Sequence, residues 1–325
     1  MELQDIAPNI CSGRDKPSHN GKVILYGSTG VIGMTESASY LDELILVARV
    51  GANAGQLQVA NSPCGVTDNT LVINAHEWNA YIYYYLQYYN LNRLVFGSGQ
   101  PLITGGMLKK IKIKFGKNVE RLKITNLLSL LDQRIATQIK IIEKLESLIK
   151  GLCQKLTQQG NPNTALNEAL VCCSSTLQES SVQEAGDYPV YGATGVCGYT
   201  DAPEVDGDSI LIIKDGASVG VTSYASGKYS AIGTLNRLVA KRGYSLRYLY
   251  YCLKVFNFAP YRTGLAIPHI YFRDYGKAKV WCPPIEEQKR ITDSLLAVDR
   301  KIAIEKSLLE QLYSQKRFLL QAMFI

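Results

Sequence analysis

The residues whose spacing first suggests chemistry are the glycines of two similar segments. VILYGSTGVIG spans residues 23–33, and YPVYGATGVCG spans residues 188–198. A glycine-rich turn between a strand and a helix is typical of dinucleotide-binding enzymes, where the helix N-terminus holds the pyrophosphate. After the second segment, however, Pro203 and the turn-forming pair Asp206–Gly207 lie where that helix would run. We therefore expect a sharp turn at both places, with a positive φ angle at one or two glycines, and a dinucleotide-binding oxidoreductase is the alternative.

Catalytic and metal-binding patterns do not stand out elsewhere in the sequence. The three histidines, His19, His76 and His269, are isolated from one another. The eight cysteines form no C-x-x-C pair, so the spacing of a zinc site is absent. The phosphate-binding pattern G-x-x-x-x-G-K-S/T and the zinc-protease pattern H-E-x-x-H are also absent. We therefore expect no catalytic residue, no metal and no cofactor bound by this chain.

The basic residues suggest a polyanionic partner. The formal net charge is +7 and the pI is near 8.8, which permits nucleic-acid binding without requiring it. In LKKIKIKF, residues 108–115, lysines alternate with apolar residues, so a strand here would expose Lys110 and Lys112 on one face. That face would either contact phosphates or simply be solvated.

Two loops are better placed to reach base edges. They are GSGQPLITGG, residues 97–106, and RTGLAIPHIYFR, residues 262–273. Glutamine can pair bidentately with adenine, and arginine with guanine, although a polar loop residue can also serve only the backbone. The candidate DNA-contacting residues are Thr29, Arg49, Gln100, Thr104, Lys110, Lys112, Thr194, Lys214, Arg237, His269, Arg273 and Lys277.

The chain shows no sign of export or membrane insertion. Its first residues lack a basic segment followed by an apolar one, and no stretch approaches about 18 apolar residues. We therefore expect no membrane partner, reduced thiols and a cytoplasmic location.

An internal repeat organises the whole sequence. YGSTGVIG at residues 26–33 matches YGATGVCG at residues 191–198, at an offset of 165 residues. Farther on the offset is 167, where ITNLLSLLDQRI at residues 124–135 matches ITDSLLAVDRKI at residues 291–302. Such a repeat predicts two copies of one α+β fold and a pseudo-two-fold molecule. A tyrosine-rich helix is expected in each copy, over residues 80–89 and 246–255.

Each copy ends in a long helix with the apolar periodicity of a coiled coil. Apolar residues recur at alternating steps of three and four, which is typical of an a/d seam. The polar seam positions Gln138 and Glu305 are repeat partners, and they either fix the register or face solvent. The seam residues are Leu128, Leu131, Ile135, Gln138, Ile142, Leu145, Ile149 and Leu152 in the first helix, and Leu295, Val298, Ile302, Glu305, Leu309 and Leu312 in the second.

The two long helices divide the chain into four parts. Asn118 is a candidate helix cap, and Pro284 is expected in the first turn of the second long helix. Antiparallel packing of these helices would cover both seams. The predicted parts are a globular domain at 1–117, a long helix at 118–158, a second globular domain at 159–283 and a long helix at 284–325.

The whole chain resembles the DNA-specificity subunit of type I restriction-modification systems. The resemblance rests on the duplicated YGSTGVIG and YGATGVCG, on GSGQP with its counterpart TGLAIPHI, and on PPIEEQKRITDSLLAVDRKI. The first copy departs from the family pattern, because KFGKNVERLKI replaces the proline and Glu-Gln opening of the long helix.

The resemblance implies that each globular part is a target recognition domain, which reads one half of a bipartite, asymmetric double-stranded DNA sequence. It implies that the helices set the unread spacer and dock two methyltransferase subunits, and that restriction/translocase subunits join the complex. S-adenosylmethionine, ATP and Mg are then expected on the partner subunits, and this chain is not an enzyme. A coiled-coil scaffold that does not bind DNA is a further alternative.

Overall fold

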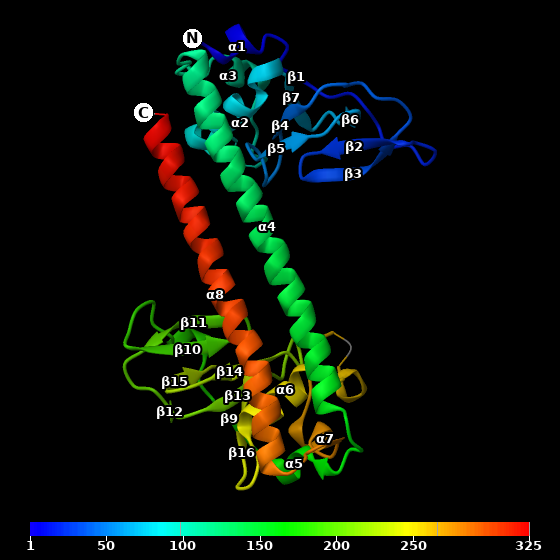
Figure 1. Cartoon of the computed structure of the whole chain (residues 1–325), viewed down its shortest axis with the longest axis vertical. Coiled ribbons are helices and arrows are strands. Elements are labelled where there is room, and N and C mark those ends of the chain that lie inside the picture. Colours follow the sequence, from blue (N-terminus) through cyan, green and yellow to red (C-terminus); the bar gives the residue numbers. More distant parts are fainter. Residues whose placement is uncertain (98, 265, 325) are drawn as a thin grey trace. The chain divides into compact units, whose positions relative to one another are not determined.

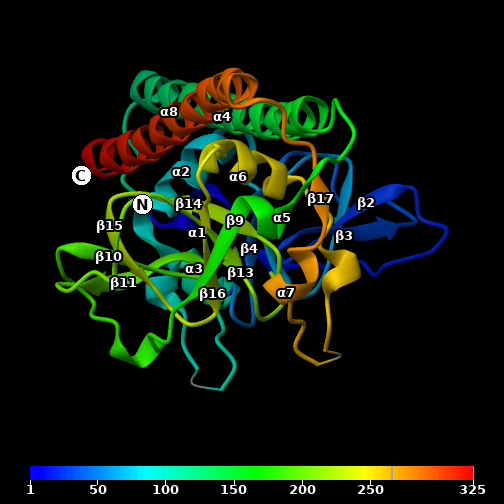
Figure 2. The same ribbon diagram turned by 90° about the horizontal axis from the view of Figure 1, so that it is seen from below.

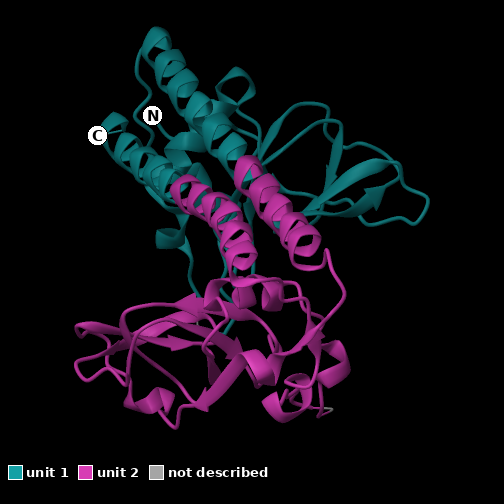
Figure 3. Ribbon diagram, turned by 60° about the horizontal axis from the view of Figure 1, so that its bottom comes forward, with its two compact units in different colours: residues 1–139, 307–325 teal, residues 140–306 magenta. Residues whose placement is uncertain are grey.

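The computed structural model describes residues 1–97, 99–264 and 266–324. The chain forms two compact units (Figure 3). Unit 1 comprises residues 1–139 and 307–325, and unit 2 comprises residues 140–306. The predicted boundaries separate globular parts from helices, whereas each compact unit combines one globular part with a section of both long helices.

Unit 1 is built on two small sheets (Figure 1). One is antiparallel with the strand order β1-β7-β4-β5, and the other has the order β3-β2-β6. Strands and helices of the globular part are α1 (Leu3–Ile6), β1 (Cys11–Ser12), β2 (Val23–Gly27), β3 (Gly30–Thr35), β4 (Leu44–Ala48), β5 (Leu57–Ala60), β6 (Cys64–Val66), β7 (Thr70–Ile73), α2 (Asn79–Tyr89) and α3 (Gly105–Lys109).

The central strand β4 of unit 1 is buried on both faces. Successive side chains of a strand point to opposite faces, so LILVA serves two cores at once. Ile45 and Val47 belong to the core that contains the tyrosine-rich helix α2. Leu44 and Leu46 belong to a smaller core shared with Tyr26 of the β2–β3 hairpin. An uninterrupted apolar strand is therefore explained by layers on both sides of the sheet.

Unit 2 repeats this plan. Its main sheet has the order β14-β13-β16-β9, which is the order of the repeat-equivalent strands of unit 1, and α6 packs on this sheet (Figure 2). Its elements are β8 (Thr164–Ala165), α5 (Leu166–Ala169), β9 (Leu170–Ser174), β10 (Tyr188–Gly192), β11 (Gly195–Thr200), β12 (Val205–Asp206), β13 (Ser209–Ile213), β14 (Thr222–Ala225), β15 (Lys228–Ala231), β16 (Leu235–Ala240), α6 (Leu246–Lys254), α7 (Phe272–Tyr275) and β17 (Lys279–Val280).

The expected repeat therefore extends to strand register. The parallel pair β2–β6 aligns Leu25 with Gly65, and the parallel pair β10–β15 aligns the equivalent Val190 with Ser230. The tyrosine-rich helices are confirmed as α2 and α6. The α+β fold with two repeated globular parts is confirmed.

The long helices are α4 (Asn118–Thr157) and α8 (Ile285–Met323). In each unit, a section of α4 runs antiparallel to a section of α8 (Figure 3). All fourteen predicted seam residues are buried or half-buried. Gln138 is 6% exposed and Glu305 is 7% exposed, so the alternative that these two face solvent is wrong. Glu305 also pairs with Lys301 at 2.5 Å.

Two local predictions are wrong. Residues 108–115 are not a strand, because the helix α3 extends to Lys109 and only Lys112 forms a bridge, to Glu2. The predicted alternation of exposure nevertheless holds: Lys110 and Lys112 are exposed and Ile111 is buried. Pro284 lies just before the first turn of α8, where its carbonyl accepts hydrogen bonds from the N–H groups of the first turn, rather than within it.

No helix in the described part of the chain is long and apolar enough to cross a membrane.

Candidate nucleic-acid interface

Each glycine-rich segment forms a β-hairpin. In unit 1, β2 turns at Ser28–Thr29 into β3, and Gly30 has a φ of 123°. In unit 2, β10 turns into β11, and Gly195 has a φ of 109°. A strand therefore follows each turn where a dinucleotide site requires a helix, so the dinucleotide-binding interpretation of these segments, on which the oxidoreductase alternative depends, is wrong. Thr29 and the equivalent Thr194 are exposed at the two hairpin tips.

A short backbone ladder holds the GSGQP loop of unit 1. Leu102 forms bridges with Val50 and with Phe96. The N–H of Ile103 donates to the Arg49 carbonyl at 2.9 Å. This ladder fixes the end of β4 beside the loop, so Arg49 and the exposed Gln100 lie in one part of the unit. We call it loop ladder 1, residues 49–51, 96–97 and 99–103.

The hairpin tip joins the same region. The Ser28 hydroxyl donates to the Asn69 carbonyl at 2.8 Å, and the Arg49 N–H donates to that carbonyl at 2.9 Å. The Arg49 guanidinium lies 3.5 Å from the Asp68 carbonyl. Thr29 and Arg49 are therefore brought together through the turn at Asp68–Asn69. Sequence reasoning missed this turn, which joins residues about 40 positions apart in the chain.

Unit 2 has an equivalent arrangement, loop ladder 2, residues 214–216, 263–264 and 266–270. His269 forms bridges with Asp215 and with Thr263, and the Ile270 N–H donates to the Lys214 carbonyl at 3.0 Å. Lys214 and His269 are therefore brought together as Arg49 and Gln100 are in unit 1. The Lys214 N–H donates to the Thr234 carbonyl, which places the equivalent turn beside them.

The arrangement matches a family of DNA-specificity proteins. The family model "Type I restriction modification DNA specificity domain" matches residues 9–147 and again residues 171–314. Together these two matches cover most of the chain.

The chain belongs to the type I restriction-modification DNA specificity family.

Relatives and solved structures agree with this family. A curated protein of Haemophilus influenzae, named as a type I restriction enzyme specificity subunit, is 27% identical over 124 residues; the match spans 37% of this chain and 32% of that protein. The crystal structure of a type I restriction-modification S subunit from M. genitalium aligns with a TM-score of 0.70 and 20% identity, covering 100% of this chain and 95% of that one. A structure described as bearing on assembly of the type I R-M system aligns with a TM-score of 0.57 and 15% identity, covering 100% and 96%. The last two likenesses show the fold.

Within this specificity-subunit fold, the remaining predicted contact residues are spread out. The Thr104 hydroxyl caps α3 by accepting from the Met107 N–H at 3.3 Å. Arg237 lies in the middle of β16 opposite Leu211, so it belongs to the sheet rather than to loop ladder 2. Lys110, Lys112 and Lys277 are exposed near the C-terminal ends of α3 and α7, and Arg273 is exposed on α7, stacked over Tyr271.

Shifted pKa values among the described residues are found on tyrosines and cysteines, and burial is the largest cause of each. Burial raises the pKa of Tyr40 to about 12 and that of Tyr224 to about 12, so both hydroxyls are neutral near pH 7. In the described ranges, no three His, Cys, Asp or Glu side chains cluster as a metal site.

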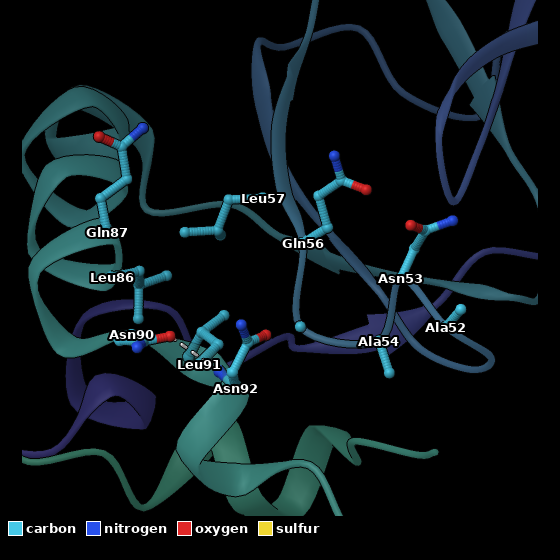
Figure 4. Close-up of a pocket in the computed structure, with 11 residues that line it drawn as sticks. Ala52, Asn53, Ala54, Gln56, Leu57, Leu86, Gln87, Asn90, Leu91 and Asn92 are labelled. Atoms are coloured by element: carbon cyan, nitrogen blue, oxygen red, sulfur yellow. Dashed lines mark hydrogen bonds between the residues drawn. The ribbon is translucent and has the colours of Figure 1, made fainter. Parts of the chain in front are cut away.

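Unit 1 also has an open cleft beside the end of α2 (Figure 4). It has a volume of about 460 Å³, and its lining includes five carboxamide side chains: Asn53, Gln56, Gln87, Asn90 and Asn92. At the equivalent place in unit 2, the Phe258 ring packs within 3.0 Å of the position a Cβ on Gly220 would occupy. The two units therefore differ here although their backbones correspond.

Proposed function

We propose that this specificity subunit gives a type I restriction-modification complex its DNA sequence specificity, with each unit reading one half of a bipartite, asymmetric site. The supporting observation is one loop ladder that occurs twice with different side chains. Arg49 and Gln100 lie at the first, and Lys214 and His269 at the second. Two unlike half-sites require a shared backbone arrangement with different side chains. Phosphate contacts position the protein in the same way at both, and base contacts specify the sequence of each.

The long helices would set the unread spacer and dock two methyltransferase subunits. A paired helix of 40 residues is a spacer of about 60 Å at about 1.5 Å per residue. The helices also carry exposed apolar side chains outside the seam, and docked methyltransferase subunits would cover them. In unit 1 these include Leu130 at 63% and Phe318 at 68% exposure, and in unit 2 Ile304 at 62%.

The chemistry of the complex would lie on other subunits. Methyltransferase subunits would carry S-adenosylmethionine, and restriction/translocase subunits would use ATP and Mg. This chain would contribute the DNA contacts and the spacing, and no catalytic group.

Mapping methylated adenine in host DNA tests the proposal. The chain is expressed with its methyltransferase partner, and residues 1–117 are then exchanged for those of another family member. We expect one half of the methylated sequence to change and the other half and the spacer to remain. An unchanged methylated sequence would contradict the proposal. Absence of salt-dependent DNA binding by the complex would favour the alternative of a coiled-coil scaffold.

A further inference from the structure

Loop ladder 2 carries a polar pair where loop ladder 1 has two apolar residues. Val50 and Leu102 are bridge partners in unit 1, and the equivalent bridge partners in unit 2 are Asp215 and His269. His269 Nδ1 lies 2.7 Å from Asp215 Oδ1. The two side chains are 35% and 34% exposed, so the pair is accessible to a ligand at the loop.

The imidazole of His269 is held in a defined position. Its backbone N–H donates to the Thr263 carbonyl at 2.7 Å, and the Thr263 N–H donates to the His269 carbonyl at 2.9 Å. Its ring is stacked with that of Tyr271 at a centroid distance of 6.5 Å and an interplanar angle of 21°. The backbone hydrogen bonds, the stacking with Tyr271 and the contact with Asp215 together restrict the position of the imidazole ring.

The partner of Nδ1 determines what Nε2 can do. A carboxylate only accepts hydrogen bonds, so Nδ1 carries a proton and Nε2 is the ring's remaining polar atom. In the protonated imidazole Nε2 also donates, and the carboxylate then makes a charge-assisted hydrogen bond with the ring. The pair thus presents a donor that depends on protonation.

Three cations lie close to the pair in the sequence, and two of them, Arg262 and Arg273, have partners of their own. Lys214 follows the last residue of β13 and precedes Asp215. The Arg262 guanidinium donates to the Val219 carbonyl at 3.2 Å, and the Arg273 guanidinium lies 4.9 Å from the Tyr271 ring centroid. Among the described residues, Asp215 is the carboxylate that contacts the imidazole, whereas Asp274 pairs with Arg273 at 3.7 Å.

We propose that His269 contacts the DNA half-site of unit 2 through Nε2–H, and that Asp215 is its positioning residue. This inference rests on the proposed DNA-reading function. The acceptor on DNA is a guanine O6 or N7 atom or a phosphate oxygen, which share the same chemistry toward a donor. Val50 and Leu102 carry no ionisable group, so loop ladder 1 has no equivalent of this donor.

The experiment uses the complex with its methyltransferase partner and a duplex carrying its mapped sequence. Binding is measured at about pH 6 and about pH 8, the range over which histidine side chains change charge. We expect wild type to bind about fivefold more tightly at the lower pH, a factor typical of the net contribution of one hydrogen bond. His269→Gln should lose this ratio. Asp215→Asn should bind more weakly than wild type near pH 7.

Asp208→Asn is the matched control, because it removes the same charge from the same unit. Asp208 accepts from the Tyr224 hydroxyl at 2.7 Å and has no contact with His269. We expect it to keep the wild-type pH ratio. A ratio that survives His269→Gln, or an Asp215→Asn variant that behaves like Asp208→Asn, would overturn the inference.

Single-base variants of the duplex distinguish the acceptors. A guanine contact predicts that His269→Gln relaxes the preference at one base pair of one half-site. A phosphate contact predicts equal weakening across all variants. Failure of the proposed function is a separate result: the wild-type complex would then show no sequence-specific binding at either pH.

Discussion

The two units share a scaffold and differ where their loops are open to solvent. Loop ladders 1 and 2 have the same bridges and the same backbone hydrogen bonds, but one joins Val50 to Leu102 and the other joins Asp215 to His269. The difference shows which features the fold requires: backbone pairing is duplicated, whereas the side chains on it have diverged. A protein that reads two unlike half-sites needs different side chains on its loops and the same backbone pairing to hold both loops.

A second comparison concerns the attachment of the tyrosine-rich helix to the long helix. The Tyr84 hydroxyl donates to Asp132 at 3.0 Å in unit 1, and the equivalent Tyr251 donates to Asp299 at 2.8 Å in unit 2. The cation differs. Lys316 of α8 pairs with Asp132 at 2.6 Å, whereas Lys254 of α6 pairs with Asp299 at 3.4 Å. The tyrosine–aspartate contact is thus part of the shared scaffold, and the cation is not.

The largest expected effect is on the free energy of unfolding. It tests whether the cores of the two units contribute equally to stability. Leu128 and its repeat partner Leu295 are both 0% exposed. Truncation to alanine should lower the free energy of unfolding by about 3 kcal/mol in either case, because each leaves a cavity. Each unit has one tryptophan, Trp78 or Trp281, so variants that retain a single tryptophan report on one unit by fluorescence.

We expect Leu128→Ala to shift the denaturant midpoint seen by Trp78 more than that seen by Trp281, and Leu295→Ala to do the reverse. Leu130→Ala is the control, because Leu130 is 63% exposed; its expected cost is below about 0.5 kcal/mol. Equal shifts at both tryptophans would mean that the chain unfolds as one cooperative body.

A smaller effect on stability is expected from replacing Asp132 or its repeat partner Asp299, and the two costs should differ. The Lys316 side chain is 15% exposed, so Asp132→Ala leaves a poorly solvated ammonium, at a cost of about 2–3 kcal/mol, while the Tyr84 hydroxyl keeps Ser129 Oγ as a partner at 3.3 Å. The Lys254 side chain is 32% exposed and can turn to water, so Asp299→Ala should cost about 1 kcal/mol less.

Combining Asp132→Ala with Lys316→Met sharpens this comparison. The double variant should recover about 1 kcal/mol relative to Asp132→Ala, because no buried charge is left. Urea unfolding followed by far-UV circular dichroism measures all variants. Equal costs for the two aspartates, or no recovery in the double variant, would show that the cation is unimportant in both units.

Sequence periodicity predicted the repeated scaffold because its signals are local. The seam of Leu128, Leu131 and Ile135 follows from spacing alone, and the hairpins follow from Pro203 and Asp206–Gly207, which exclude a helix. The segment 108–115 shows the limit of such reasoning. Its alternation of lysines and apolar residues correctly predicts alternating exposure. The segment nevertheless begins within a short helix, which Thr104 caps.

Long-range partners were not predictable from such patterns. Asp215 and His269 are 54 residues apart, and the turn at Asn69 is 41 residues from Ser28. Spacing carries no information over such distances when the connecting strands are short. One signal was present: at repeat-equivalent positions, an apolar pair in the first copy is replaced by an acid and a histidine in the second. Two positions that change together in a complementary way are expected to be in contact.

The smallest expected effect concerns buried thiols, which are distributed unequally. The core of unit 2 contains Cys153, Cys252 and Cys282, whereas the cores of unit 1 contain Cys64. Burial raises the pKa of Cys153 to about 11 and that of Cys282 to about 11. An unfolded thiol has a pKa of about 8.5, so it releases its proton first as the pH rises.

The sign of the pH effect follows from this order. Below about pH 8.5 the thiols are protonated in both states, and the stability of unit 2 does not depend on them. Between about pH 8.5 and pH 11 the unfolded state is increasingly favoured, by about 1 kcal/mol per thiol near pH 9.5. We therefore expect unfolding seen by Trp281 to shift to lower denaturant between about pH 7.5 and pH 9.5, and unfolding seen by Trp78 to shift less. Cys153→Ala should reduce the shift at Trp281, whereas substitution of the exposed Cys11 should not change it. Equal shifts at both tryptophans would mean that the buried thiols of unit 2 do not control its alkaline stability.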